Sequence, residues 1–251
     1  MDLSDTTKVQ THFDQRAATY SNLFDNSVRD GVGHKFRCRR DLIETLLAGK
    51  KGRLLDCATG TGEVTLAGLL SGDFDSAAIN DYSNEMLARS RSRIESASHS
   101  NSIPAKIEFS HANAFDLEGI VASSSIDTML CLGLIAHVGR LEGMLGLANR
   151  LLTDTGQLLF QTSLLDHLGV RLIKRLSERR HIKANGDAVT HYWHKDVAKA
   201  AKDAGLDIIE CRRYGFDVPF LDRFAKRSQL KGSEAIYVLT KTQGNLDEPT
   251  Q

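Results

Sequence analysis

The segment RLLDCATGTGEVTLAGLL, residues 53–70, places the strongest constraint on how this chain can fold. An apolar run reaches Asp56, turns through Gly60 and Gly62, and continues with the spacing of a helix. Glycine lets a backbone approach a ligand where a Cβ would collide. In a parallel sheet such a strand-to-helix turn lies at the carboxyl edge, where ligands bind. The segment therefore predicts a strand, a ligand-binding turn and a helix.

Strand and helix patterns alternate over most of the remaining chain, which predicts an α/β fold with a doubly wound sheet. Near-continuous apolar runs such as TMLCLGL favour parallel strands that are covered on both faces. We expect strands at 53–58, 76–81, 105–110, 126–133, 156–162, 207–215 and 233–241. Helices are expected at 62–71, 84–97, 140–152 and 194–205.

The length of 251 residues fits one α/β domain with a lid. Residues 1–47 have helical spacing and are predicted to form an N-terminal helical lid. Residues 48–242 are predicted to form the core, with a cap inserted at about 164–192. Residues 243–251 show no apolar pattern and are predicted to be a flexible tail.

Composition argues against several kinds of partner and site. The formal net charge is zero, so no overall field favours nucleic acid or a membrane surface. No apolar run approaches the roughly 20 residues of a membrane span, and the first residues lack the pattern of a signal peptide. The four cysteines are scattered, which favours a reducing, cytoplasmic setting. No Asp, Glu, His or Cys cluster has metal-ligand spacing, so no metal is expected.

The acidic residues around the turn indicate the kind of ligand. Asp81 ends the next strand, 19 positions after Gly62, and a carboxylate there suits the hydroxyls of a ribose. NAD(P) is the first alternative, but Thr65 stands where its motif needs a third small residue. A pyrophosphate would also lie beside Asp56 and Glu63, at roughly 4 kcal/mol for each like-charge contact. The turn therefore favours S-adenosylmethionine, which carries an adenosine and two cationic groups.

Five segments resemble the motifs of class I S-adenosylmethionine-dependent methyltransferases: LLDCATGTGEVT, INDYSNEMLARSR, FSHANAFDL, SIDTMLCLGLIAHV and ANRLLTDTGQLLF. The resemblance covers about residues 9–163 and implies a Rossmann-like sheet of seven strands, the last one antiparallel. It also implies cofactor contacts from these residues: Asp56, Ala58, Thr59, Gly60, Gly62, Asp81, Tyr82, Met86, Asn113, Ala114, Phe115, Cys131 and Leu132.

The N-terminal half, VQTHFDQRAATY…DGVGHKFRCRRDL, is similar to the ubiquinone/menaquinone C-methyltransferases. The chain departs from that family at GLIAHV, where the family reads Gly-Leu-Arg-Asn. The resemblance implies methyl transfer to a small, aromatic or lipophilic acceptor at O, C or N. Three alternatives stay open: a quinone-precursor C-methyltransferase, a carrier-protein-bound acyl O-methyltransferase, and a non-catalytic S-adenosylmethionine-binding protein. Nucleic-acid methylation is disfavoured, because the Asn/Asp-Pro-Pro-Tyr/Phe and Pro-Cys motifs are absent.

Three residues are candidates for the chemistry. His137 follows the fourth strand at the cofactor edge, where it could be a general base or a packing residue. His191 could line the acceptor pocket, and the hydroxyl of Tyr20 could close over the cofactor. His34 could touch a ligand, and so could Arg39 or Arg40. A solvated helix face also explains these residues.

Residues 164–183 form a cationic amphipathic segment with six Lys and Arg against two acids. A solvated helix explains this pattern. The alternative is contact with an anionic acceptor, an acyl-carrier protein or a membrane surface that holds a lipophilic acceptor.

Overall fold

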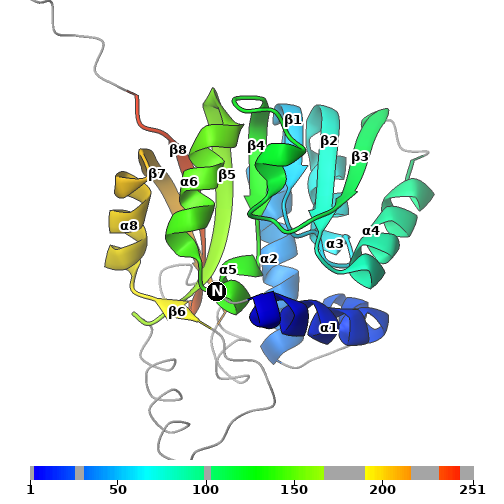
Figure 1. The fold of residues 1–251 in the computed structure, drawn as a ribbon. Helices are drawn as coiled ribbons and strands as arrows, with labels where there is room; N and C mark the ends of the chain where they lie inside the picture. The colour runs from blue at the N-terminus through cyan, green and yellow to red at the C-terminus, as the bar shows by residue number, and fades with distance from the viewer. Residues whose placement is uncertain (1–2, 26–30, 99–102, 167–189, 216–231, 244–251) are drawn as a thin grey trace, which may run out of the picture.

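The computed structural model describes residues 3–25, 31–98, 103–166, 190–215 and 232–243. A central sheet runs through these residues (Figure 1). Its strands are β1 (Lys51–Asp56), β2 (Asp73–Asp81), β3 (Lys106–His111), β4 (Ile126–Cys131), β5 (Leu152–Leu164), β6 (His191–Tyr192), β7 (Leu206–Tyr214) and β8 (Glu234–Lys241). The strand order is β3-β2-β1-β4-β5-β8-β7, with the short β6 paired to β5.

Strand directions confirm the predicted fold class. The pairs among β3, β2, β1, β4 and β5 are all parallel. Strand β8 runs antiparallel to both β5 and β7. The topology is therefore the Rossmann-like doubly wound sheet with an antiparallel last strand that the motifs implied. Because the strand order reverses between β1 and β4, a crevice opens at their carboxyl ends.

Helices cover both faces of the sheet, and the bounds of the helices are α1 (Leu3–Tyr20), η1 (Ser21–Phe24), α2 (Gly31–Leu47), α3 (Glu63–Ser71), α4 (Asn84–Ser96), η2 (Leu117–Gly119), α5 (Leu134–Val138), α6 (Leu141–Leu151) and α8 (His194–Asp203). One core cluster packs α6 and α8 against one face of the sheet. The other cluster packs α2 and α3 against the opposite face. Both faces are buried, as expected from the continuous apolar strands.

The N-terminal segment divides into two parts. Helix α2 belongs to the core, because Ile43 and Leu47 are fully buried against the sheet. Helix α1 lies across the carboxyl ends of β1 and β2 and packs against α4 (Figure 1). Among the described residues of the predicted lid, 3–25 and 31–47, α1 and η1 are therefore the elements placed to cover the crevice.

Some expectations differ from the structure at element boundaries. Strand β5 begins at Leu152, four residues before the expected start, because it extends back to pair with Ile126 of β4. The two-residue strand β6 was not expected. Most of the predicted cap, including residues 167–183 of the cationic segment, lies outside the described residues, as does the predicted tail from residue 244.

A membrane-spanning segment would need a long apolar helix. None of the helices in the described ranges has the length and apolarity to cross a bilayer.

Candidate functional site

Asp56, the last residue of β1, lies buried beneath the glycine turn with 2% of its surface exposed. Its Oδ1 accepts a hydrogen bond from the Ala58 amide at 3.1 Å, and its Oδ2 accepts one from Thr65 Oγ1 at 2.6 Å. Burial raises the pKa of Asp56 to about 6, although both hydrogen bonds oppose the shift. The charge of this carboxyl therefore depends on pH and on what binds beside it.

The two glycines of the turn have different roles. Both have positive φ angles, +58° at Gly60 and +83° at Gly62. A Cβ on Gly60 would meet, among the described residues within 4 Å, only the Tyr20 ring at 3.9 Å, so the space above it is open to a ligand. A Cβ on Gly62 would lie 2.9 Å from Ser90 Cα in α4. Gly62 thus permits α3 and α4 to pack closely, and its contact with a cofactor stays a prediction.

Asp81 ends β2 with its carboxylate facing the glycine turn. Its Oδ2 accepts a hydrogen bond from the Gly60 amide at 2.7 Å, and its Oδ1 accepts one from the Ser83 amide at 2.9 Å. Burial raises the pKa of Asp81, and these backbone hydrogen bonds oppose the shift. Since a carboxylate can accept about four hydrogen bonds, lone pairs remain for a ligand.

Asn80, which sequence reasoning missed, fastens the loops around the turn. Its side chain is fully buried, and its Nδ2 donates to Cys57 O at 3.1 Å and to Ala112 O at 2.9 Å. Its Oδ1 accepts hydrogen bonds from Ser110 Oγ at 2.9 Å and from the Ala112 amide at 3.1 Å. The available signal was a polar residue inside the apolar run SAAIND.

A cleft with about 870 Å³ of empty space, partly open to solvent, runs along these strand ends. A smaller cavity of about 350 Å³ adjoins it at the glycine turn. The two are lined by eleven of the thirteen predicted cofactor residues: Asp56, Ala58, Thr59, Gly60, Asp81, Tyr82, Met86, Asn113, Ala114, Phe115 and Leu132. The remaining two, Gly62 and Cys131, are not among the lining residues. Cys131 is fully buried in the core cluster beneath α6.

Glu63 does not present an isolated charge at the turn. Its Oε1 pairs with Arg93 Nη2 at 2.6 Å, and its Oε2 accepts a hydrogen bond from Thr61 Oγ1 at 2.5 Å. The expected repulsion between this residue and a pyrophosphate is therefore largely offset by Arg93. The negative character of the turn depends on Asp56 instead.

Helix α1 is held over the cleft by a polar contact as well as by packing. Ser83 caps α4, where its Oγ accepts a hydrogen bond from the Met86 amide at 3.1 Å. The same hydroxyl donates to Asp14 of α1. Phe13 and Tyr20 of α1 both line the cleft, so the helix forms one of its walls.

His137 and Tyr20, two of the three catalytic candidates, lie at this cleft. The His137 ring packs edge-on against Phe13, with 5.1 Å between ring centroids. Burial raises the pKa of Tyr20 and nearby Arg39 opposes the shift, so the hydroxyl stays protonated at neutral pH. His191 lies on β6 and is not among the residues that line the described cavities.

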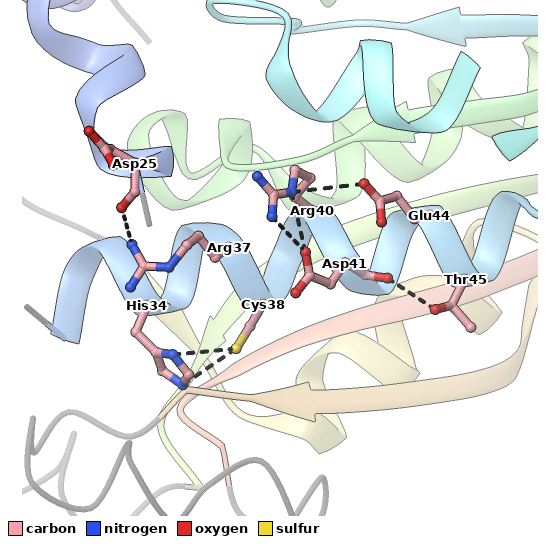
Figure 2. A network of polar contacts seen from close by, with 8 residues as sticks. All are labelled: Asp25, His34, Arg37, Cys38, Arg40, Asp41, Glu44 and Thr45. Atoms are coloured by element: carbon pink, nitrogen blue, oxygen red, sulfur yellow. Dashed lines mark hydrogen bonds and ion pairs between the residues drawn. The ribbon is translucent and has the colours of Figure 1, made fainter. Parts of the chain in front are cut away.

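The residues on α2 separate into surface and buried groups. His34 Nε2 lies 3.4 Å from Cys38 Sγ, and Arg40 Nη2 lies 3.0 Å from Asp41 Oδ1. Figure 2 shows both contacts on α2. Arg39, by contrast, is 9% exposed and lines two cavities beside the turn. A solvated helix face therefore explains Arg40 but not Arg39. The missed signal was spacing, because Arg39 precedes the buried Ile43 by four residues and so shares its helix face.

Metal ligands were not expected in this chain. Among the residues that the structure describes, no group of three or more His, Cys, Asp or Glu is placed to hold a metal ion.

Comparisons with known proteins place these features in context. A family model described as a methyltransferase domain matches residues 33–211. No curated protein matches the chain. Many solved structures share its fold. The magnesium protoporphyrin IX methyltransferase of Synechocystis PCC 6803, with bound SAH, has a TM-score of 0.66 at 14% identity, over 94% of this chain and 99% of that one.

A second similar structure comes from Thermotoga maritima and is described as a SAM-dependent methyltransferase, possible histamine N-methyltransferase. It has a TM-score of 0.63 at 16% identity, over 93% of this chain and 99% of that one. At such identities the likeness to both structures establishes a shared fold and leaves the acceptor open.

Proposed function

This chain belongs to the methyltransferase-domain family, and from that premise we propose that it is an S-adenosylmethionine-dependent methyltransferase with a small-molecule acceptor. One observation carries the proposal: the cleft beside Gly60 and Asp81 adjoins a further cavity, and His137 and Tyr20 line both. Methyl transfer needs this arrangement, because cofactor and acceptor must meet end to end in a site that excludes water. The narrower similarity to quinone C-methyltransferases stays a prediction.

The residues of the cleft fit the cofactor. Asp81 would accept hydrogen bonds from the ribose hydroxyls. The open space over Gly60 would admit the part of the ligand that lies against the backbone of the turn. Met86 lies buried on the adenine side. The Phe115 amide already donates to Asn113 Oδ1 at 3.0 Å, so we assign the adenine edge to Asn113 Nδ2 and the Ala114 amide. When bound, the cofactor supplies an electrophilic methyl group on a positively charged sulfur.

Asp56 provides the negative charge that suits a cationic cofactor. Its carboxyl lies under the turn and lines the smaller cavity. A nearby cation would favour the ionised form and so lower the raised pKa of this group. The turn would thus respond to the cofactor by releasing a proton from Asp56.

His137 is assigned as the general base for acceptors that must lose a proton. It lines both cavities, whereas Tyr20 keeps its proton and so is not available as a base; its hydroxyl can still donate or accept a hydrogen bond. A positioned base of this kind contributes about 10²–10⁴-fold to a rate. His191 inherits the role if His137 only packs.

Calorimetry tests the cofactor assignment directly. S-adenosylmethionine and S-adenosylhomocysteine should both bind the full chain with one site, and NAD(H) should not bind. Asp75→Asn, which removes an exposed carboxylate on β2, serves as the control and should bind like the unaltered protein. Binding of NAD(H) without S-adenosylhomocysteine would overturn the proposal.

A further inference from the structure

A third cavity, with about 1040 Å³ of empty space partly open to solvent, lies beyond the cleft and is called here the distal chamber. It shares four lining residues with the cleft: Phe13, Tyr20, Gly133 and His137. Its other walls come from η1, α2, α5, β5, β7 and β8 and mix apolar side chains with polar ones.

Arg39 is the buried cation of the distal chamber. Its Nη1 donates to Gln161 Oε1 at 3.2 Å, and its guanidinium lies 4.5 Å from the centre of the Phe36 ring. Its Nε is buried and has no hydrogen-bond partner among the described residues. A buried cation whose donors are incompletely satisfied is costly, and an anion beside it would remove that cost.

Among the residues that the structure describes, the other charged groups of the chamber do not supply that anion. Glu234, the acid among these described lining residues, accepts hydrogen bonds from Gln161 Nε2 at 2.8 Å and from Ser163 Oγ at 2.9 Å. Lys35 Nζ lies 4.0 Å from the same carboxylate and balances its charge. Arg16 stands at the exposed end of the chamber, and its Nη1 contacts His12.

Two tyrosines and a histidine are the remaining titratable groups among the described lining residues. Tyr20 and Tyr214 line the chamber, and burial raises the pKa of each, so both are neutral at ordinary pH. His137 lies where the chamber meets the cleft. With Lys35 and Glu234 offsetting each other, Arg39 contributes a positive charge that no carboxylate among the described residues pairs with at ion-pair distance, although Asp56 at the glycine-turn cavity attracts it through space.

We propose that the distal chamber holds the methyl acceptor and that Arg39 binds a carboxylate on it, with the acceptor's apolar body against Phe36 and Phe13. The inference rests on the proposed methyltransferase function and names its acceptor class: a small carboxylic acid with an aromatic or other apolar body. A guanidinium matches the planar carboxylate through paired hydrogen bonds. A phosphate dianion suits the chamber less, because it would meet one buried cation and the carboxylate of Glu234.

The test compares small carboxylates with their own primary amides, which keep the shape and lose the charge. Benzoate, 4-hydroxybenzoate, 4-hydroxyphenylacetate and hexanoate, each with its amide, are titrated into the full chain saturated with S-adenosylhomocysteine. At least one acid should bind tenfold or more tightly than its amide. The comparison needs no variant, so it holds whatever a substitution does to folding.

Variants then test whether the Arg39 side chain causes the preference for the acid over its amide. Arg39→Gln should remove the preference for the acid while the folded variant still binds S-adenosylhomocysteine. Arg39→Lys keeps the charge without the paired donors and should keep part of the preference. Arg40→Gln is the matched control, because Arg40 pairs with Asp41 on the surface, and it should behave like the unaltered protein.

Two outcomes overturn the inference and leave the cofactor assignment intact. In the first, no acid binds more tightly than its amide, although S-adenosylhomocysteine binds. In the second, Arg39→Gln loses S-adenosylhomocysteine while other folded variants keep it, which would assign Arg39 to the carboxylate of the cofactor. Failure of the unaltered protein to bind S-adenosylhomocysteine would instead overturn the proposed function.

Discussion

Replacing Asp56 with asparagine should stabilise the protein near neutral pH and weaken its binding of the cofactor. Burial raises the pKa of this carboxyl from 3.8 to about 6. A shift of about 2 pKa units corresponds to roughly 3 kcal/mol of differential free energy between the charged and neutral forms. The residue is 2% exposed, so solvent screening takes little from that figure.

The sign follows from proton linkage. The folded state holds the Asp56 proton more tightly than the unfolded state, so ionising the group costs stability. That stability is fully present below pH about 4 and is lost as the pH rises to about 6. Asparagine carries no charge at any pH and escapes the loss. The asparagine Oδ1 can accept a hydrogen bond from the Ala58 amide, as the carboxylate of Asp56 does. The asparagine Nδ2 can donate a hydrogen bond to Thr65 Oγ1, because the Thr65 hydroxyl can then donate to Thr59 Oγ1 instead.

Urea unfolding of both proteins between pH 4 and 8 measures the effect. The free energy of unfolding of Asp56→Asn, minus that of the unaltered protein, should rise by about 3 kcal/mol between pH 4 and 7. Asp73→Asn removes a carboxylate that is exposed at the surface and paired with Lys51, and its difference should stay flat. In calorimetry, the affinity of the unaltered protein for S-adenosylmethionine should weaken as the pH falls through about 6. The affinity of Asp56→Asn should not show this dependence. A pH-independent stability difference would refute the reasoning.

Three further predictions concern single positions. Asp81→Ala should weaken S-adenosylmethionine binding at least tenfold, because each charge-assisted hydrogen bond to the ribose contributes about 1.5–3 kcal/mol; unchanged affinity in calorimetry of a folded variant would place the ribose elsewhere. His137→Asn should cost on the order of 10²-fold in turnover, with cofactor affinity nearly intact; full turnover on the true acceptor would end the base assignment. Gly62→Ala should lower the free energy of unfolding by more than the roughly 1–2 kcal/mol of left-handed strain, because its Cβ would meet the backbone of Ser90. Gly60→Ala should cost only that strain yet block the cofactor, and equal losses in denaturant unfolding would contradict the distinction.

The glycine turn and the acid beside it could be predicted from the sequence because contiguous segments encode them. The turn after β1 and the acid that ends β2 each follow a buried strand, and parallel strands bring their carboxyl ends to one edge. Gly60 and Asp81, 21 residues apart, therefore had to meet, and the structure joins them by a hydrogen bond. Local patterns and fold topology together were sufficient for these contacts.

The distal chamber could not be predicted in the same way. Its walls come from α1, α2, β5, β7 and β8, which are distant in the sequence and carry no shared motif. The segment HKFRCRRDL contains three arginines, and their charge alone does not indicate which of them lies on the buried face of the helix. Asn80 was missed for a related reason. Its hydrogen-bond partners lie on a neighbouring strand and on loops, so its structural role is visible only in three dimensions.

The buried amide of Asn80 also divides the molecule into a constant part and an adaptable part. From its place on β2 it ties together the loops that follow β1 and β3, beside the glycine turn. None of its four hydrogen bonds reaches the strands that wall the distal chamber. If the chamber holds the acceptor as proposed, substitutions on β5 or β7 should reshape it without breaking the hydrogen bonds that Asn80 makes on the other side of the cleft. For protein engineering, these strands are therefore the first positions to vary in a search for a new acceptor.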